Sequence, residues 1–414
     1  MVFLKREISI LHLIMIKDRG FMKYRKLLCL AATVGLVVTA VAGCGKEETE
    51  KATVVAETIS PIEEAVSEEA ETETVEESQY LYPVIEEREV VDGKMQSYLT
   101  GEWVDEKIAN RRPIAVSIPN QKSCLPQYGI GNASVIYQVP LRDNLTRLFC
   151  MFEDFDDLDR IGPTRSIRDY MVYIGLEHDA IICHWGSAVY ANDLLNSDMV
   201  DNISQATSGI DDPTPGAFDR YNRAGSYNST DSAYMFVDGL MTGVEKQGYS
   251  WDYSDTFEPK FLFAADGVEA TYDDADTATK IWPGTEGNYN TVGAYFEYDE
   301  TTGKYAYYEY DKPLIDERTG EQLMVDNVVL QVCYAEERDD HGYLIMEMHG
   351  PQTGDGTMYF FTNGKVVKGS WERMNGDESP AKYYDAEGNE IVFNQGKTFV
   401  CEIWDKWADS ITYE

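Results

Sequence analysis

Two segments among the first 80 residues of this 414-residue chain cannot contribute to a globular core. Leu27–Ala42 is apolar and uncharged, follows three basic residues, and ends in small side chains. Residues 45–80 then contain twelve Glu, two Lys and no aromatic residue before the last position. The first pattern is typical of a secretory signal. The second cannot bury enough apolar surface to fold, and its like charges keep it extended. We therefore expect the folded part to begin at about residue 81.

The boundary between the two segments, Val41-Ala-Gly-Cys44, resembles the lipobox of bacterial lipoproteins. The resemblance implies that residues 1–43 are a signal peptide, that Cys44 carries acyl chains such as palmitate, and that residues 44–80 are an acidic tether. Two acyl chains anchor a protein stably in a membrane. The alternative is an uncleaved signal anchor with an incidental Cys44. A second apolar run precedes Met22, and we expect Met22 to be the true start.

The charge balance restricts the possible partners. The chain has 35 Lys and Arg against 73 Asp and Glu, a formal net charge of −38. Such a surface repels nucleic-acid phosphates and anionic lipid head groups. We therefore expect no nucleic-acid partner, and membrane attachment through the lipid on Cys44 at the extracytoplasmic face. The cysteines form no CxxC pair and the histidines no HExxH motif, so we predict no disulfide framework, metal site or cofactor.

The remaining chain divides by pattern at about residue 257. In residues 81–257, apolar runs that indicate buried strands alternate with helical patterns, which predicts an α/β domain with a mixed sheet and flanking helices. The strands are expected at 113–118, 134–139, 146–152 and 180–185, and the helices at 161–177 (capped by Thr164 or Ser166), 188–195 and from Thr230 to 246.

Residues 258–414 are rich in aromatic and β-branched runs separated by turn signals. This pattern predicts a mostly antiparallel β domain, and an α+β fold overall. Strands are expected at 294–298, 305–310, 327–332 and 343–348. Many of the tyrosines lie in this half, and we expect them to pack across strands rather than to stack on sugars or partner proteins.

Several short motifs resemble the YerB-like family of bacterial lipoproteins. They include Arg112-Pro-Ile-Ala-Val, Leu145-Thr-Arg-Leu-Phe and Ile161-Gly-Pro-Thr-Arg-Ser-Ile-Arg in the first half, and Lys368-Gly-Ser-Trp-Glu-Arg in the second. The resemblance spans roughly residues 98–405. It implies an N-terminal α/β domain, a C-terminal domain and lipid attachment, with no established activity. Family members often carry a Pro-His-Asn sequence that residues 223–230 lack, so chemistry resting on that His is not expected here.

The segment from Gly162 to Asp169 is the strongest candidate for a binding site. A loop that leads into a helix offers backbone N–H groups to an anion, and guanidinium groups match phosphate or carboxylate bidentately. His184 is added because strand ends face ligand crevices in α/β sheets. The predicted anion site comprises Arg147, Thr164, Arg165, Ser166, Arg168 and His184. The alternative is a structural network in which Asp143, Glu153, Asp154 or Asp169 neutralises the arginines.

Three functions remain open. We favour a non-enzymatic binding or scaffold lipoprotein of the cell envelope with an anion pocket, whose ligand is unknown. The rival is an envelope enzyme acting on a phosphorylated or peptidoglycan-related substrate, which would place a nucleophile or general base within reach of the arginines. A protein-interaction module would instead expose an apolar patch on the β domain.

Overall fold

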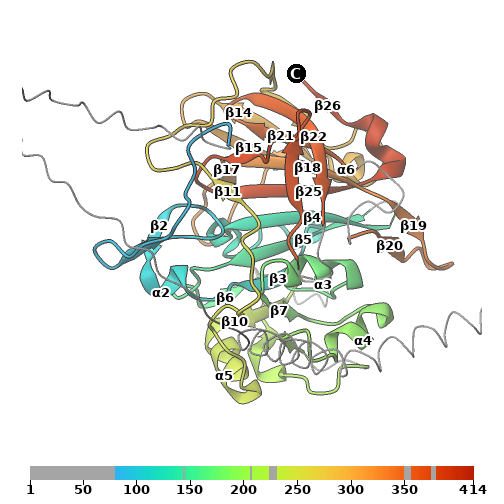
Figure 1. Ribbon diagram of the computed structural model, residues 1–414. Coiled ribbons are helices and arrows are strands. Elements are labelled where there is room, and N and C mark those ends of the chain that lie inside the picture. The colour runs from blue at the N-terminus through green and yellow to red at the C-terminus, as the bar shows by residue number, and fades with distance from the viewer. Residues whose placement is uncertain (1–79, 143–144, 206–207, 223–230, 349–355, 374–378) are drawn as a thin grey trace, which may run out of the picture. The chain divides into compact units, whose positions relative to one another are not determined.

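The computed structural model describes residues 80–142, 145–205, 208–222, 231–348, 356–373 and 379–414 (Figure 1). These residues belong to one compact unit, Val75–Glu414. The predicted signal peptide, Cys44 and the acidic tether lie outside the described residues, as does the segment 223–230. Within the described part of the chain, no helix has the length and apolar character needed to cross a membrane.

One large sheet organises the fold. Its ten-strand path runs in the order β12 (Asp276–Thr277), β22 (Lys365–Glu372), β21 (Thr357–Thr362), β18 (Asn327–Cys333), β25 (Thr398–Trp404), β4 (Val135–Arg142), β5 (Leu145–Phe152), β3 (Ile114–Pro119), β7 (Ile181–His184) and β8 (Asn202–Ser204), and an eleventh strand, β23 (Lys382–Asp385), pairs with β22. The two halves of the sequence meet where β25 pairs in parallel with β4. Strands from both sides of residue 257 therefore share this sheet, and the domain boundary at that residue stays a prediction.

The large sheet is buried on both faces. Alternate residues of β5 show this, because Phe149 and Met151 belong to one apolar cluster whereas Leu148 and Cys150 belong to the other. Both faces need apolar residues, so the central strands are continuous apolar runs. The five described cysteines are all buried, as their apolar surroundings in the sequence predict.

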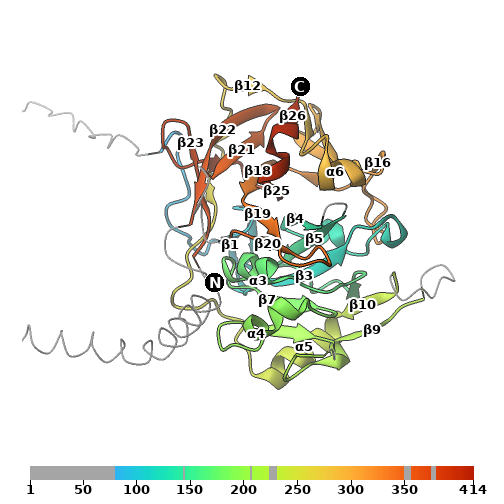
Figure 2. The same cartoon turned by 90° about the vertical axis from the view of Figure 1, so that its right-hand side faces the viewer.

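Helix α3 (Asp169–Leu176) covers one face, together with the parallel pair β11 (Leu262–Phe263) and β24 (Val392–Phe393). The other face packs against α5 (Val237–Gln247) and a second sheet (Figure 2). That sheet consists of β16 (Lys312–Pro313), β15 (Lys304–Glu309), β14 (Tyr295–Asp299), β13 (Lys280–Trp282) and β26 (Thr412–Tyr413), with β17 (Met324–Val325) paired to β15.

Short elements complete the described fold. The small sheets are β1 (Lys94–Gln96) with β2 (Trp103–Asp105), β6 (Arg160–Ile161) with β10 (Ala233–Phe236) and β9 (Phe218–Arg220), and the hairpin β19 (Ala335–Glu337) with β20 (Leu344–Met346). The short helices are α2 (Glu106–Ala109), α4 (Asn192–Leu195), α6 (Gly287–Val292) and the 3₁₀ turns η1 (Lys122–Cys124), η2 (Ile130–Asn132), η3 (Val189–Ala191), η4 (Pro215–Ala217) and η5 (Asp405–Ser410).

The predicted fold class is confirmed: a mixed sheet with few helices is followed by a mostly antiparallel β region. The eight predicted strands are present, with ends shifted by at most three residues. The cross-strand tyrosine packing is also present, since Tyr295 and Tyr308 face each other in the register of β14 and β15 with ring centroids 4.6 Å apart.

The helix boundaries required correction. Thr164 and Ser166 do not cap α3, which begins at Asp169 after Arg168. The helix predicted for residues 188–195 is a 3₁₀ turn followed by a single α-helical turn. The helix predicted from Thr230 begins only at Val237, because the preceding residues form strand β10.

Candidate anion-binding site

The loop from Gly162 to Arg168 lies across the carboxyl ends of two parallel strands, β3 and β7. The Arg165 N–H donates to the Ser117 carbonyl at 2.8 Å, and the Arg165 carbonyl accepts from the Trp185 N–H at 3.2 Å. Two residues later, the Ile167 N–H donates to the Gly186 carbonyl at 3.0 Å. These backbone bonds hold the loop extended and explain why α3 begins late. They also occupy the backbone N–H groups of Arg165 and Ile167, which are therefore not available to an anion.

Arg147 lies under this loop. Adjacent strand residues alternate between faces, so Arg147 points to the same face of β5 as Phe149, the face that α3 covers. One of its terminal nitrogens donates to the Ser166 carbonyl, whereas Nε has no hydrogen-bond partner among the described residues. Only 8% of Arg147 is exposed.

The charge of Arg147 is costly in this position. Burial and, to a smaller extent, the nearby charges of Arg168 and Arg165 lower the pKa of its guanidinium from its ordinary value to about 9. The group nevertheless stays protonated at neutral pH. Three positive charges therefore lie near one another in a chain whose net charge is −38.

The carboxylates expected to neutralise the arginines are engaged elsewhere or lie apart. Asp169 forms an ion pair with Arg338 at 2.7 Å. Glu153 accepts hydrogen bonds from two serine hydroxyls, at 2.6 and 3.0 Å. Asp154 is exposed, and Asp143 lies outside the described residues. Among the ion pairs of the described residues, none joins a carboxylate to the three arginines of the predicted site.

A cavity of about 300 Å³, here called the basic cavity, opens beside Arg168. Its described lining is Leu141, Arg142, Arg168, His341, Gly342 and Tyr343. The last three residues come from the loop that connects β19 to β20. Asp339 orders this loop, because its Oδ1 accepts the backbone N–H groups of His341 at 2.9 Å and Tyr343 at 3.2 Å. The described part of the lining thus contains two arginines and a histidine and no carboxylate.

The other residues of the predicted site support the loop. Thr164 is fully buried and its hydroxyl donates to the Ala233 carbonyl at 3.3 Å. The hydroxyl of Ser166 donates to the Trp185 carbonyl at 3.4 Å. His184 is fully buried, with Nδ1 2.7 Å from the Gly186 carbonyl oxygen. Burial lowers the pKa of His184 to about 4, so its ring is neutral at pH 7.

Of the six predicted residues, Arg168 lines the basic cavity and the other five do not. Arg142 and His341 also line the cavity and were not among the predicted residues. Arg142 is the last residue of β4, and His341 belongs to a hairpin loop 173 positions after Arg168 in the numbering. Neither residue lies in a recognisable motif, so only the folded arrangement brings them to the site.

The enzymatic alternative requires a nucleophile or general base within reach of the arginines. A nucleophile with its base would appear as a Ser or Cys hydroxyl or thiol hydrogen-bonded to a histidine. Among the hydrogen bonds of the described residues, His178 is joined to Tyr137 and His184 to the Gly186 carbonyl, and neither to a Ser or Cys. His341 lines the basic cavity beside the arginines, without a Ser or Cys in the described lining. In the same part of the chain, no group of three His, Cys, Asp or Glu residues is arranged to hold a metal ion.

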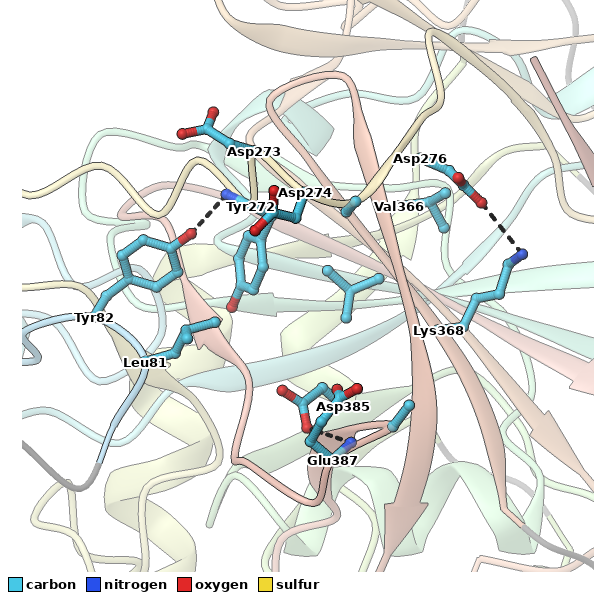
Figure 3. A pocket seen from close by; sticks show the side chains of 13 residues that line it. Leu81, Tyr82, Tyr272, Asp273, Asp274, Asp276, Val366, Lys368, Asp385 and Glu387 are labelled. Atoms are coloured by element: carbon cyan, nitrogen blue, oxygen red, sulfur yellow. Dashed lines mark hydrogen bonds and ion pairs between the residues drawn. The ribbon is translucent and has the colours of Figure 1, made fainter.

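A larger cavity of about 400 Å³ lies on another part of the surface, between β12, β22 and the turn after β23 (Figure 3). Its charged lining is mostly acidic, with Asp273, Asp274, Asp276, Asp385 and Glu387 facing the single cation Lys368. The Lys368 Nζ lies 3.6 Å from an Asp276 carboxylate oxygen. This cavity cannot serve an anion, because its carboxylates would repel one.

Comparisons with known proteins agree with this architecture. Residues 99–250 match the N-terminal domain, and residues 285–400 the C-terminal domain, of a family described as "Protein of unknown function (DUF3048)". The chain is 24% identical over 321 residues to a Bacillus subtilis protein named "Putative lipoprotein YerB", covering 77% of this chain and 89% of that protein. The crystal structure of Bacillus subtilis YerB matches the fold with a TM-score of 0.62 and 21% identity, covering 77% of this chain and 99% of that one. The chain therefore belongs to the YerB-like family of two-domain proteins, as its motifs indicated.

Proposed function

We propose that the protein is an envelope lipoprotein, anchored through Cys44 at the extracytoplasmic face of the membrane, that binds an anionic group without catalysing a reaction. The anion, a phosphate or carboxylate of an envelope component, would enter the basic cavity beside Arg168. Arg147 and Arg165 would strengthen binding through their charge. Thr164, Ser166 and His184 would hold the loop that positions these arginines.

One observation carries the proposal: Arg147 is 8% exposed and carries a charge for which the described residues offer no carboxylate partner. Burying a charge without a counterion costs several kcal/mol, and the cost falls when an opposite charge is brought close. An anion in the basic cavity would contact Arg168 directly and would act on the nearby charges of Arg147 and Arg165 only through longer-range attraction. Each arginine also offers a planar fork of donors that matches phosphate and carboxylate oxygens.

Support for the anchor is separate from support for the site. The signal pattern ends in a lipobox-like sequence at Cys44, and the Bacillus subtilis relative is named a lipoprotein. The acidic tether that follows would keep the folded unit away from an anionic membrane surface, since like charges repel. Replacing Cys44 by Ala should move the protein from the membrane fraction to the soluble fraction. Unchanged fractionation would contradict lipid anchoring.

The site can be tested on the chain from residue 44 onward, with Cys44→Ser in place of the lipid anchor. Thermal unfolding would be followed with inorganic phosphate, acetate, nucleotides and cell-wall fragments. A ligand at 100 times its Kd adds about 2.7 kcal/mol to the free energy of unfolding. We expect a stabilising anion, and we expect the shift to disappear in Arg168→Gln.

Arg318→Gln is the matched control, because Arg318 is an exposed arginine that hydrogen-bonds to Asn132 and the Asp157 carbonyl, away from the basic cavity. This variant should retain the full shift. A shift that persists in Arg168→Gln, or that is lost equally in both variants, would contradict the proposed site.

A further inference from the structure

A second cavity lies next to the basic cavity, on the other side of the start of α3. It has a volume of about 290 Å³ and is here called the tyrosine cavity. Its lining is Asp169, Tyr170, Tyr173, Tyr334, Glu336, Arg338, Ile345, Met346 and Glu347. These residues come from α3 and from both strands of the β19–β20 hairpin, which lies beside α3 in both views (Figures 1 and 2).

The two cavities are immediate neighbours. Arg168 lines the basic cavity and the next residue, Asp169, lines the tyrosine cavity. Consecutive Cα atoms are about 3.8 Å apart. Near them, the 2.7 Å ion pair of Asp169 with Arg338 joins α3 to the hairpin, and the ring of Tyr190 lies 4.3 Å from the Arg338 guanidinium and contacts Tyr343 edge-on.

The tyrosine cavity has the chemistry of a sugar site. Tyr334 is 39% exposed, and its hydroxyl donates a hydrogen bond to the Glu336 carboxylate at 3.1 Å. Tyr173 contributes a half-buried ring from α3. Tyrosine rings offer an apolar face with a polar edge, and carboxylates accept hydrogen bonds from hydroxyl groups. A sugar ring presents C–H groups on its faces and hydroxyls around its rim, so both features match it.

The charges of the two cavities determine which end of the ligand each can bind. The described lining of the basic cavity contains Arg142, Arg168 and His341. The tyrosine cavity contains Glu336 and Glu347, which would repel a phosphate, together with Arg338, whose charge is paired with Asp169. We propose that the two cavities together bind a glycosyl phosphate, with the phosphate in the basic cavity and the sugar ring in the tyrosine cavity. This inference rests on the proposed function and adds the class of ligand. A free sugar phosphate and a phosphate-bearing glycan share this chemistry.

Calorimetric titration of the chain from residue 44 onward, carrying Cys44→Ser, would test the inference with three probes: inorganic phosphate, glycerol 3-phosphate and glucose 1-phosphate. The first tests the anion site, the second adds hydroxyls without a ring, and the third adds the sugar ring. We expect glucose 1-phosphate to bind about tenfold more tightly than the other two, a difference of about 1.4 kcal/mol. A glycan fragment that carries the same phosphate would bind at least as tightly if the polymer is the source of the ligand.

The variants Tyr334→Ala and Tyr173→Ala should reduce the advantage of glucose 1-phosphate to about threefold or less and leave the affinity for inorganic phosphate unchanged. Tyr221→Ala is the control, because Tyr221 is exposed to a similar extent (37% against 39%) and contacts Tyr234 and Arg160 elsewhere.

The possible failures are distinguishable. Equal affinities for the three probes, with inorganic phosphate still bound by the arginines, would overturn the sugar site and leave the proposed anion site intact. An equal loss of affinity for inorganic phosphate and glucose 1-phosphate in the tyrosine variants would also overturn the sugar site. No binding of any probe would overturn both proposals.

Discussion

Glu309 is a buried carboxyl group between the two largest sheets, and its replacement by glutamine should make the protein less sensitive to alkaline pH. Its Oε2 accepts hydrogen bonds from Asn120 Nδ2 at 3.2 Å and from the Tyr307 hydroxyl at 3.4 Å. Its Oε1 has no hydrogen-bond partner among the described residues. Burial raises the pKa of Glu309 to about 8, although both hydrogen bonds act in the opposite direction. The carboxyl group is therefore protonated in the folded protein at pH 6.

The sign and size of the effect follow from this pKa. The unfolded chain has the ordinary value of 4.5, so between pH 4.5 and 8 the folded state binds more protons than the unfolded state. Stability must then fall as pH rises. From pH 6 to pH 8 this one group should cost about 2 kcal/mol. Glu309→Gln keeps an oxygen for the two donors and cannot ionise, so the variant should lack that loss.

Urea unfolding of both proteins at pH 6, 7 and 8 would measure the difference. Glu153 and Glu402, whose pKa values are raised to about 7 mainly by burial, add their own slope to both proteins equally. The difference between the two proteins therefore isolates Glu309. The exposed Glu300→Gln serves as the control and should follow the wild type at all three pH values. A constant difference between Glu309→Gln and the wild type from pH 6 to pH 8 would refute the reasoning.

Two further substitutions test the buried interactions. Glu177→Gln should cost about 3–5 kcal/mol, because it removes the buried carboxylate that lies 3.0 Å from Lys260 and 2.7 Å from Arg373. A cost below about 1 kcal/mol in urea unfolding would argue against this. Burial acts to raise the pKa of Glu177, but the two cations outweigh burial and lower the pKa to about 2. The free energy of unfolding of the wild type should therefore fall by about 3 kcal/mol between pH 4.5 and pH 2, and that of the variant should not. Gly239→Ala should destabilise the protein by roughly 1–3 kcal/mol despite alanine's higher helix propensity, because the new Cβ would lie 2.3 Å from the Gly216 carbonyl oxygen. Gly216→Ala is the control: its new Cβ would meet nothing within 4 Å, so thermal unfolding should be nearly unchanged.

The central strands could be predicted because the sequence carries their signal locally. Strands such as β3 and β5 are buried on both faces, so each is a short and mostly apolar segment. The sequence also points to two of the arginines through a local pattern. Arg165 and Arg168 lie close together in the sequence, and charged groups near a helix start are recognisable without a structure.

The remaining features depend on contacts between distant residues. The start of α3 was misplaced because the loop before it pairs with β3 and β7, and Arg165 and Ile167 donate their backbone N–H groups there. A cap residue such as Thr164 is a local signal that this pairing overrides. Arg142 comes to the basic cavity from the end of β4 and His341 from a distant hairpin loop, and the proposed sugar site needs a helix and that hairpin to meet. Neither arrangement has a local pattern.

A crystal structure of the protein with inorganic phosphate would test most directly whether an anion binds in the basic cavity. We predict phosphate density in the basic cavity, within hydrogen-bond distance of Arg168 and of Arg142 or His341, and no density there in Arg168→Gln. Phosphate bound only elsewhere, or an empty cavity at a phosphate concentration that saturates the thermal shift, would contradict the account.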